Sequence, residues 1–141
     1  MVGKLARWLR VLGIDVVYSN TLTDDEILRI ATSEHRVILT RDVAFAARLS
    51  SGQFLFIESD HYRDQVRQVL RAFDIKDFNV FSRCLECNAG LESVDKQTIA
   101  DRVPPYVYQT QERFAICPSC KRVYWRGTHA DQMLKRLPIQ L

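Results

Sequence analysis

The sequence predicts a mixed α/β domain, with a parallel sheet flanked by helices, followed by a smaller cysteine-bearing module. From residue 2 to residue 73, segments with helical periodicity alternate with short, nearly all-apolar segments, which is typical of a parallel sheet covered by helices on both faces. Beyond Phe81 the pattern changes, and all four cysteines lie there. We therefore place the α/β domain at residues 1–81 and the second module at residues 82–141.

Hydrophobic periodicity and capping residues locate the individual elements. We expect helices over residues 2–12, 23–33, 43–49 and 62–73, and strands over residues 15–18, 36–40 and 53–58. Gly13 is placed to end the first helix, and Thr23 with Glu26 forms a capping box that begins the second. In the second module we expect short strands over residues 106–108 and 123–125 and a last helix over residues 128–137.

The four cysteines form two C-x2-C pairs, Cys84 with Cys87 and Cys117 with Cys120. Two residues between cysteines let one tight turn direct both thiolates at the same ion, and two such turns complete a tetrahedral shell that suits structural Zn²⁺. The sequence therefore predicts a zinc ribbon-like module. The alternatives are two disulfides, which need an oxidising compartment, a pair of redox motifs, and an iron–sulfur cluster.

Acidic residues follow the predicted strands, at the edge of an open α/β sheet where sites form. Asp24, Asp25 and Glu26 come after the first strand, and Asp42 comes after the second. Converging carboxylates there can bind Mg²⁺ or Mn²⁺ and support hydrolysis of a phosphodiester. The same residues also stand where helix caps and first-turn acids belong, so a purely structural role is the alternative.

Basic residues supply a possible nucleic-acid surface. Lys4, Arg7 and Arg10 lie on the first helix, Arg41 precedes Asp42, and Arg83 precedes the first cysteine pair. Guanidinium and ammonium groups at these positions can contact phosphates. For the basic residues around the cysteines, a merely solvated surface is the alternative.

The bulk composition sets limits on the class of protein. The chain has 141 residues and a net charge of +3, a balance that permits binding to RNA without requiring it. We find no apolar run long enough to cross a membrane and expect no membrane partner. Arginines interrupt the apolar N-terminal segment, so we expect no signal peptide and a cytoplasmic location.

Several stretches together resemble the Mut7-C RNase domain family. They are Gly3–Arg10 with Leu12-Gly13, Asp25–Leu28, Leu39–Asp42, Ser82–Asn88, Pro104-Pro105, Phe114–Cys117, Cys120, Tyr124-Trp125, Gly127, His129 and Met133. The resemblance implies a PIN-like nuclease fold with a C-terminal zinc ribbon, and metal-dependent cleavage of RNA. It also implies that Asp42 in Thr40-Arg41-Asp42 and Asp25, with Asp24 as its neighbour, are catalytic ligands of Mg²⁺ or Mn²⁺.

The sequence departs from the family pattern at its beginning. Family members usually begin with a hydrophobic strand that ends in an aspartate ahead of the Gly-Lys-Leu-Ala-Arg helix, whereas this sequence starts with that helix. We therefore expect either a start further upstream or an incomplete catalytic site. The first hypothesis is a ribonuclease acting on single-stranded RNA. The second is a non-catalytic RNA- or ribonucleoprotein-binding module, and the third is an adaptor that binds a protein partner, or associates with itself, at an exposed sheet edge.

Overall fold

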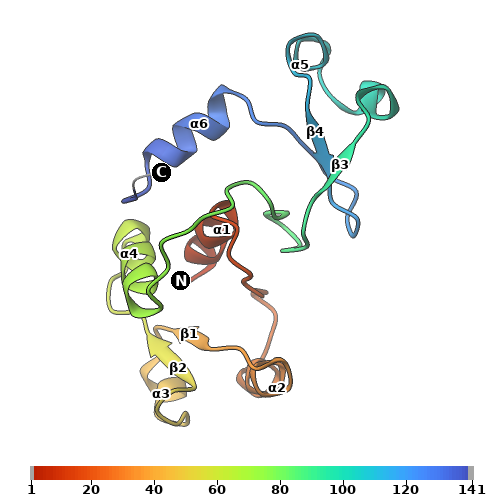
Figure 1. Ribbon diagram of the computed structural model, residues 1–141. Coiled ribbons are helices and arrows are strands. Elements are labelled where there is room, and N and C mark those ends of the chain that lie inside the picture. Colours follow the sequence, from red (N-terminus) through yellow and green to blue (C-terminus); the bar gives the residue numbers. More distant parts are fainter. Residues whose placement is uncertain (1, 140–141) are drawn as a thin grey trace.

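The computed structural model describes residues 2–139 and has mixed α/β architecture (Figure 1). Its elements are α1 (Gly3–Val11), α2 (Asp24–Glu34), β1 (Ile38–Thr40), α3 (Val43–Ala46), β2 (Phe54–Phe56), α4 (Tyr62–Ala72), β3 (Glu92–Val94), a 3₁₀ helix η1 (Lys96–Arg102), α5 (Pro105–Thr110), β4 (Phe114–Ile116), β5 (Val123–Tyr124) and α6 (Thr128–Lys135). No helix of these described residues is long and apolar enough to cross a membrane.

A small parallel sheet organises the first part of the chain. Strands β1 and β2 pair in parallel, with Ile38 opposite Phe54. The predicted strand over residues 15–18 is not formed. This segment runs beside α1 without a neighbouring strand, and the backbone groups of Val16 bond instead to side chains, its N–H to Asn88 and its carbonyl to Arg10. The prediction of a strand over residues 15–18 is therefore wrong, and the parallel sheet has two strands among the described residues.

Helix α1 occupies the centre of the main core. Leu5, Leu9 and Leu12 are almost fully buried and share this core with the apolar face of α4. Gly13 ends the helix with a φ of 87°, and a side chain there would collide with the backbone of Asn79, so glycine is required for both reasons. At the start of α2, the Thr23 hydroxyl accepts a hydrogen bond from the Glu26 N–H, as the capping box predicts.

The cysteine-bearing part contains an antiparallel sheet in the order β3-β4-β5. Strand β5 confirms the strand predicted around residue 123, but the strand predicted over residues 106–108 is wrong, because these residues lie in α5. Pro105 occupies the first turn of α5, where its missing N–H is not needed and its fixed φ favours a helix. This part has its own small core around Ile99 and Phe114.

The last helix, α6, returns to the first part of the chain. Leu134 and Leu137 pack into the same core as α1 and α4, and Figure 1 shows α6 on the other side of α1 from the sheet. The chain thus crosses from the α/β part to the cysteine-bearing part and back. Apolar burial therefore joins residues on both sides of the boundary predicted near residue 81.

Candidate functional site

The two cysteine turns have the same backbone geometry. In the first, the N–H of Cys87 points to the Cys84 sulfur at 3.4 Å, and in the second the N–H of Cys120 points to the Cys117 sulfur at 3.4 Å. The residue after each pair, Asn88 or Lys121, adopts the left-handed conformation with a φ of 67°. N–H groups that point at the sulfurs favour the thiolate form, which is the form that binds metal.

The four sulfurs converge at one point. All four Sγ atoms of Cys84, Cys87, Cys117 and Cys120 lie within 4.8 Å of one another, and those of Cys84 and Cys120 are 3.6 Å apart. Four thiolates at about 2.3 Å from a tetrahedral Zn²⁺ are separated from each other by roughly 3.8 Å. A disulfide needs about 2.05 Å, and the cysteines are free thiols. The residues therefore fit a closed structural zinc site, as predicted.

Neighbouring groups form hydrogen bonds with the cysteine sulfurs that favour the thiolate form. The Tyr124 hydroxyl accepts a hydrogen bond from the Leu85 N–H at 3.2 Å and lies 3.1 Å from the Cys84 sulfur, so its own proton is free to bond that sulfur. Burial raises the pKa of Tyr124, which keeps this donor protonated. A hydrogen bond from the backbone of Arg122 lowers the pKa of the Cys120 thiol to about 6. The sequence analysis assigned Tyr124 no role at the cysteines, although it lies in a predicted strand and in one of the stretches that resemble the family.

Two of the predicted RNA-binding arginines hold the first cysteine turn in place. Arg10 is only 5% exposed and donates to the carbonyl oxygens of Leu85 at 2.9 Å and Glu86 at 3.3 Å. Arg83 donates to the carbonyls of Gly13 and Asn88. Because these donors are engaged in backbone contacts, both guanidinium groups connect the cysteine turn to the segment that follows α1. Arg10 is not part of the exposed basic surface.

The predicted acidic residues lie at helix starts. Asp25 is ion-paired with Arg48 at 2.6 Å, and Asp24 lies 3.9 Å from the same guanidinium. The Arg48 pKa is raised, chiefly by the hydrogen bond that its guanidinium donates to the Asp25 carboxylate. Asp42 accepts a hydrogen bond from the Phe45 N–H at 3.1 Å and so caps α3.

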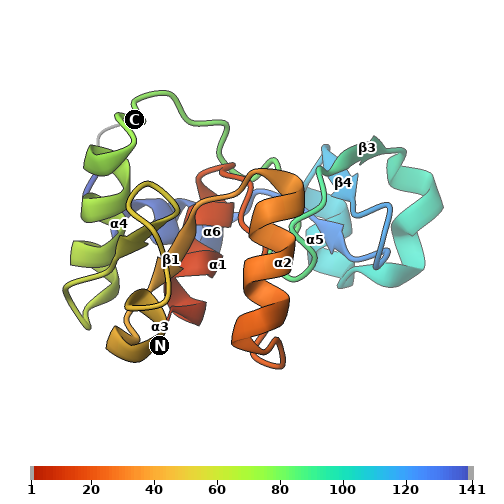
Figure 2. The same cartoon turned by 90° about the horizontal axis from the view of Figure 1, so that it is seen from below.

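These carboxylates are not gathered into a metal-binding cluster. Among the residues that the structure describes, the four cysteines are the one group of three or more possible metal ligands that converge. The helix starts that carry Asp24, Asp25 and Asp42 nevertheless lie on one side of the sheet. Figure 2 places the N-terminal end of α1 on this side as well. The donor atoms suit Mg²⁺ or Mn²⁺, but their present positions do not form a ligand shell for such an ion.

Basic and aromatic side chains adjoin this side of the sheet. Lys4 lies 4.4 Å from the centre of the Tyr62 ring, and that ring stacks on both Trp8 and His61. Arg7 is exposed and pairs with Glu86 at 3.2 Å. Sequence reasoning did not single out His61 and Tyr62 together, because their stacking on α1 depends on how α4 packs.

Arg41 is held against the loop that follows β2. Its Nη1 donates to the carbonyl oxygen of Ile57 at 3.2 Å. Its Nε is buried and has no hydrogen-bond partner among the described residues. The guanidinium of Arg41, which we predicted to contact phosphate, is thus partly occupied by a hydrogen bond to the backbone, next to the residue that caps α3.

The chain is thus a mixed α/β protein with a small parallel sheet and four cysteines whose arrangement could hold a structural metal ion. The family model for the Mut7-C RNAse domain matches residues 1–137. The chain therefore belongs to the Mut7-C RNAse domain family, as its sequence motifs predicted. Searches of curated proteins and of solved structures found no match.

Proposed function

We propose that this protein is a metal-dependent ribonuclease of PIN-like type that cleaves single-stranded RNA. The observation that carries the proposal is the family match over nearly the whole chain. It is supported by the placement of Asp24, Asp25 and Asp42 at helix starts on one side of the parallel sheet, since α/β sites lie at such edges. The proposed roles of these carboxylates are to bind Mg²⁺ or Mn²⁺, which would orient water and offset charge on the phosphate.

Arg48 is central to how the acidic residues would act. Its guanidinium neutralises Asp25 and approaches Asp24, and it also lies 5.9 Å from the centre of the Phe45 ring. The positively charged guanidinium of Arg48 therefore lies between the first turn of α2 and α3, the helix that Asp42 caps. An ion bound by these acids would displace Arg48 from Asp25, which leaves the guanidinium free for a phosphate.

The RNA would be held mainly by exposed groups. Lys4 lies beside the stacked rings of His61 and Tyr62, and Arg7 is exposed about one turn further along α1, where it pairs with Glu86. Ammonium and guanidinium groups bind the phosphate backbone, and aromatic rings stack on bases that are not paired. This combination favours single-stranded RNA over a duplex. The zinc-binding part would support the fold, with Arg83 and Arg10 holding it in place.

The test is cleavage of a fluorescent single-stranded RNA with Mn²⁺, comparing the natural chain with Asp42→Asn. Asparagine remains a good N-cap for α3 but removes the charge, so loss of activity by about 100-fold or more would report chemistry rather than unfolding. Asp101→Asn, at an exposed position in the cysteine-bearing part, is the matched control and should retain full activity. Equal cleavage by Asp42→Asn and the control would contradict the catalytic role.

A second function is favoured by one observation. Asp25 is paired with Arg48, and the described carboxylates do not converge, so the chain as it stands matches a non-catalytic RNA- or ribonucleoprotein-binding module. In the same experiment this alternative predicts tight binding of RNA without cleavage at any Mn²⁺ concentration. Binding that weakens in Lys4→Ala and Arg7→Ala, with no cleavage by the natural chain, would support it.

A further inference from the structure

Charge is distributed unevenly among the helices. Helix α2 carries four acidic residues and one arginine, whereas α4 carries three arginines and one aspartate, a net charge of +2. Helix α1, which shares the main core with α4, carries three cations and no acidic residue. Figures 1 and 2 place α2 and α4 on opposite sides of the β1–β2 pair. A polyanion is therefore attracted to the side of the molecule that α1 and α4 form.

The three arginines of α4 form one stripe on its surface. Arg63, Arg67 and Arg71 recur at every fourth residue, a spacing that places them on the same side of a helix. All three are exposed, while the apolar face of α4 is buried in the main core. Of the three, only Arg67 has an ion pair among the described residues, with Asp64 at 3.2 Å. The stripe therefore presents guanidinium groups that are available to a ligand.

The loop that precedes α4 fixes where the stripe begins. Gln65 donates a hydrogen bond to the carbonyl of Ser59 at 2.8 Å, and Gln68 donates to the carbonyl of Phe56 at 2.7 Å. Gln65 is 1% exposed, so its bond is shielded from water. These bonds hold the first turns of α4 at the carboxyl end of β2. Because β1 and β2 are parallel, this is also the edge of the sheet at which Asp42 follows β1.

The stripe leads from this edge along the outside of the molecule. At its start it adjoins Tyr62, over whose ring the Lys4 ammonium lies at 4.4 Å. From Arg63 to Arg71 the helix rises by about 12 Å, which at 3.4 Å per stacked nucleotide corresponds to roughly four nucleotides. A row of cations of this length that begins beside an aromatic ring has the two components of a surface for single-stranded nucleic acid.

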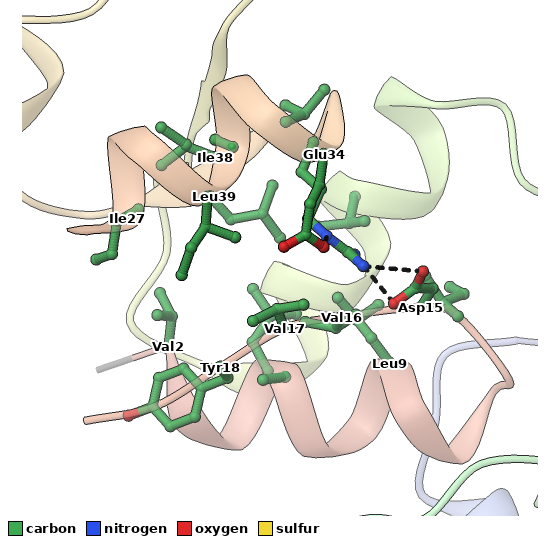
Figure 3. A pocket seen from close by; sticks show the side chains of 18 of the residues that line it. Val2, Leu9, Asp15, Val16, Val17, Tyr18, Ile27, Glu34, Ile38 and Leu39 are labelled. Carbon is green, nitrogen blue, oxygen red and sulfur yellow. Dashed lines mark hydrogen bonds and ion pairs between the residues drawn. The ribbon is translucent and has the colours of Figure 1, made fainter. Parts of the chain in front are cut away.

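The groove beside α1, about 510 Å³ in volume, offers no comparable route for a polyanion (Figure 3). Its lining is mainly apolar, with Leu9 and Leu39 among its residues. The arginine in this lining, Arg36, is already paired with Asp15 and Glu34. A phosphate backbone gains most of its binding energy from available cations, so it is better matched by α4 than by the groove.

The exposed face of α4 also differs from one that binds a membrane. A helix that lies on a lipid surface presents large apolar side chains to the acyl chains, beside its cations. In α4 the large aliphatic residues Val66, Val69 and Leu70 are all buried in the core. The stripe therefore offers charge without an apolar face, which favours a nucleic acid over a lipid surface.

We propose that the exposed face of α4 is a track for the phosphate backbone of single-stranded RNA, with Arg63, Arg67 and Arg71 contacting successive phosphates. The proposal rests on RNA being the ligand, as in the proposed function, and adds the course that the strand takes outside the candidate site. Nucleotides at the edge of the sheet would lie near the Tyr62 ring, and those beyond would follow α4. Arg67 would exchange an exposed carboxylate partner for a phosphate, which costs little because exposed ion pairs are weak.

The experiment measures binding of the full chain to a fluorescent single-stranded oligouridine of about twelve nucleotides by anisotropy, without Mn²⁺ so that the strand stays intact. Arg63→Gln, Arg67→Gln and Arg71→Gln each remove one charge and keep a good helix former. Each should weaken binding by about threefold to tenfold and should lower the slope of log K against log salt concentration by about 0.7. The triple glutamine variant should combine these losses.

Two controls separate the track from general charge and from misfolding. Arg113→Gln removes an exposed arginine next to β4, which Figure 1 shows apart from α4, and this variant should bind like the natural chain. Replacing all three arginines of α4 by lysine keeps the charges and should retain most of the affinity and the salt slope. Vesicles that contain phosphatidylserine serve as the competing anionic surface and should bind the natural chain and the triple glutamine variant equally weakly.

Four results would overturn the proposal: no binding of the oligouridine by the natural chain, unchanged binding by the triple glutamine variant, an equal loss in Arg113→Gln, and vesicle binding that depends on the α4 arginines while RNA binding does not. The ribonuclease proposal fails differently. Arginine-dependent binding without cleavage in Mn²⁺ would leave the track standing and reject the nuclease, whereas cleavage by a chain whose RNA binding ignores the α4 arginines would do the reverse.

Discussion

Asp15 shows how one residue can serve two parts of the molecule. Its carboxylate accepts hydrogen bonds from Arg36 and from the Asn88 side chain, at 2.6 Å for the latter. Arg36 is the first cause of the lowered pKa of Asp15, ahead of the contribution from Asn88. Because Asn88 ends the first cysteine turn, this carboxylate connects the segment that follows α1 to the cysteine site. Asp15 therefore couples the α/β part to the cysteine-bearing part, as Arg10 and Arg83 also do.

The lowered pKa of Asp15 predicts a pH dependence of stability. A carboxylate with a lower pKa in the folded chain stabilises it above the unfolded value of about 3.9, and this contribution is lost as the pH falls through the folded value. The natural chain should therefore exceed Asp15→Asn in unfolding free energy at pH 7, by about 1 kcal/mol or less because the side chain is half exposed. Near pH 3 the two should converge.

Urea denaturation between pH 3 and pH 7 measures this difference. Asp74→Asn, which removes an exposed ion pair with Lys76, is the control and should change stability little at either pH. A constant difference between the natural chain and Asp15→Asn across this range would show that Asp15 does not act through its charge.

At the scale of elements, α1 contacts both the α/β part and the cysteine-bearing part of the molecule. One face packs on α4, and its last turn carries Arg10, which reaches the first cysteine turn. Its helical pattern was visible in the sequence because apolar residues recur at the helical period. The role of Arg10 was not visible, since a basic residue at this spacing reads as solvent-exposed. Only the approach of residues 85 and 86, far along the chain, gives it backbone partners.

Replacing Arg10 should therefore affect folding more than RNA binding. Arg10→Met removes part-buried, charge-assisted hydrogen bonds to the carbonyls of Val16, Leu85 and Glu86, which should cost about 2–4 kcal/mol of unfolding free energy. Arg7→Met, one turn earlier, removes only an exposed ion pair with Glu86 and should cost about 1 kcal/mol or less. Chemical denaturation of both variants makes the comparison. Equal small losses would mean that Arg10 does not anchor the turn.

At the scale of the whole molecule, metal binding and the α/β fold are expected to depend on each other. The first cysteine turn supplies the carbonyls of Leu85 and Glu86 to Arg10, and the side chain of Asn88 to Val16 and Asp15. Zinc that holds this turn in its conformation therefore also stabilises the segment after α1. Leu134 of α6 and Leu137, which follows that helix, add a second connection.

Removing zinc should thus loosen more than the cysteine-bearing part. Native mass spectrometry should find one Zn²⁺ per chain. After chelation, hydrogen exchange should increase around both cysteine turns and also at residues 14–18, while β1 and β2 keep most of their protection. Added Zn²⁺ should restore the protection. Increased exchange confined to the cysteine turns would show that the metal site is energetically independent of the α/β part.

The sequence alone determined several features, because each depends on local chemistry. The C-x2-C spacing defined the metal site, apolar periodicity defined α1 and α4, and Thr23 with Glu26 marked the start of α2. The tertiary structure decided the rest. A strand needs a neighbour, and residues 15–18 have none among the described residues, so the backbone of Val16 bonds to the side chains of Asn88 and Arg10 instead. Likewise, the sequence shows that Arg10 and Asp25 are charged but does not show what they contact. Long-range packing places Arg10 against backbone carbonyl oxygens and Asp25 against Arg48.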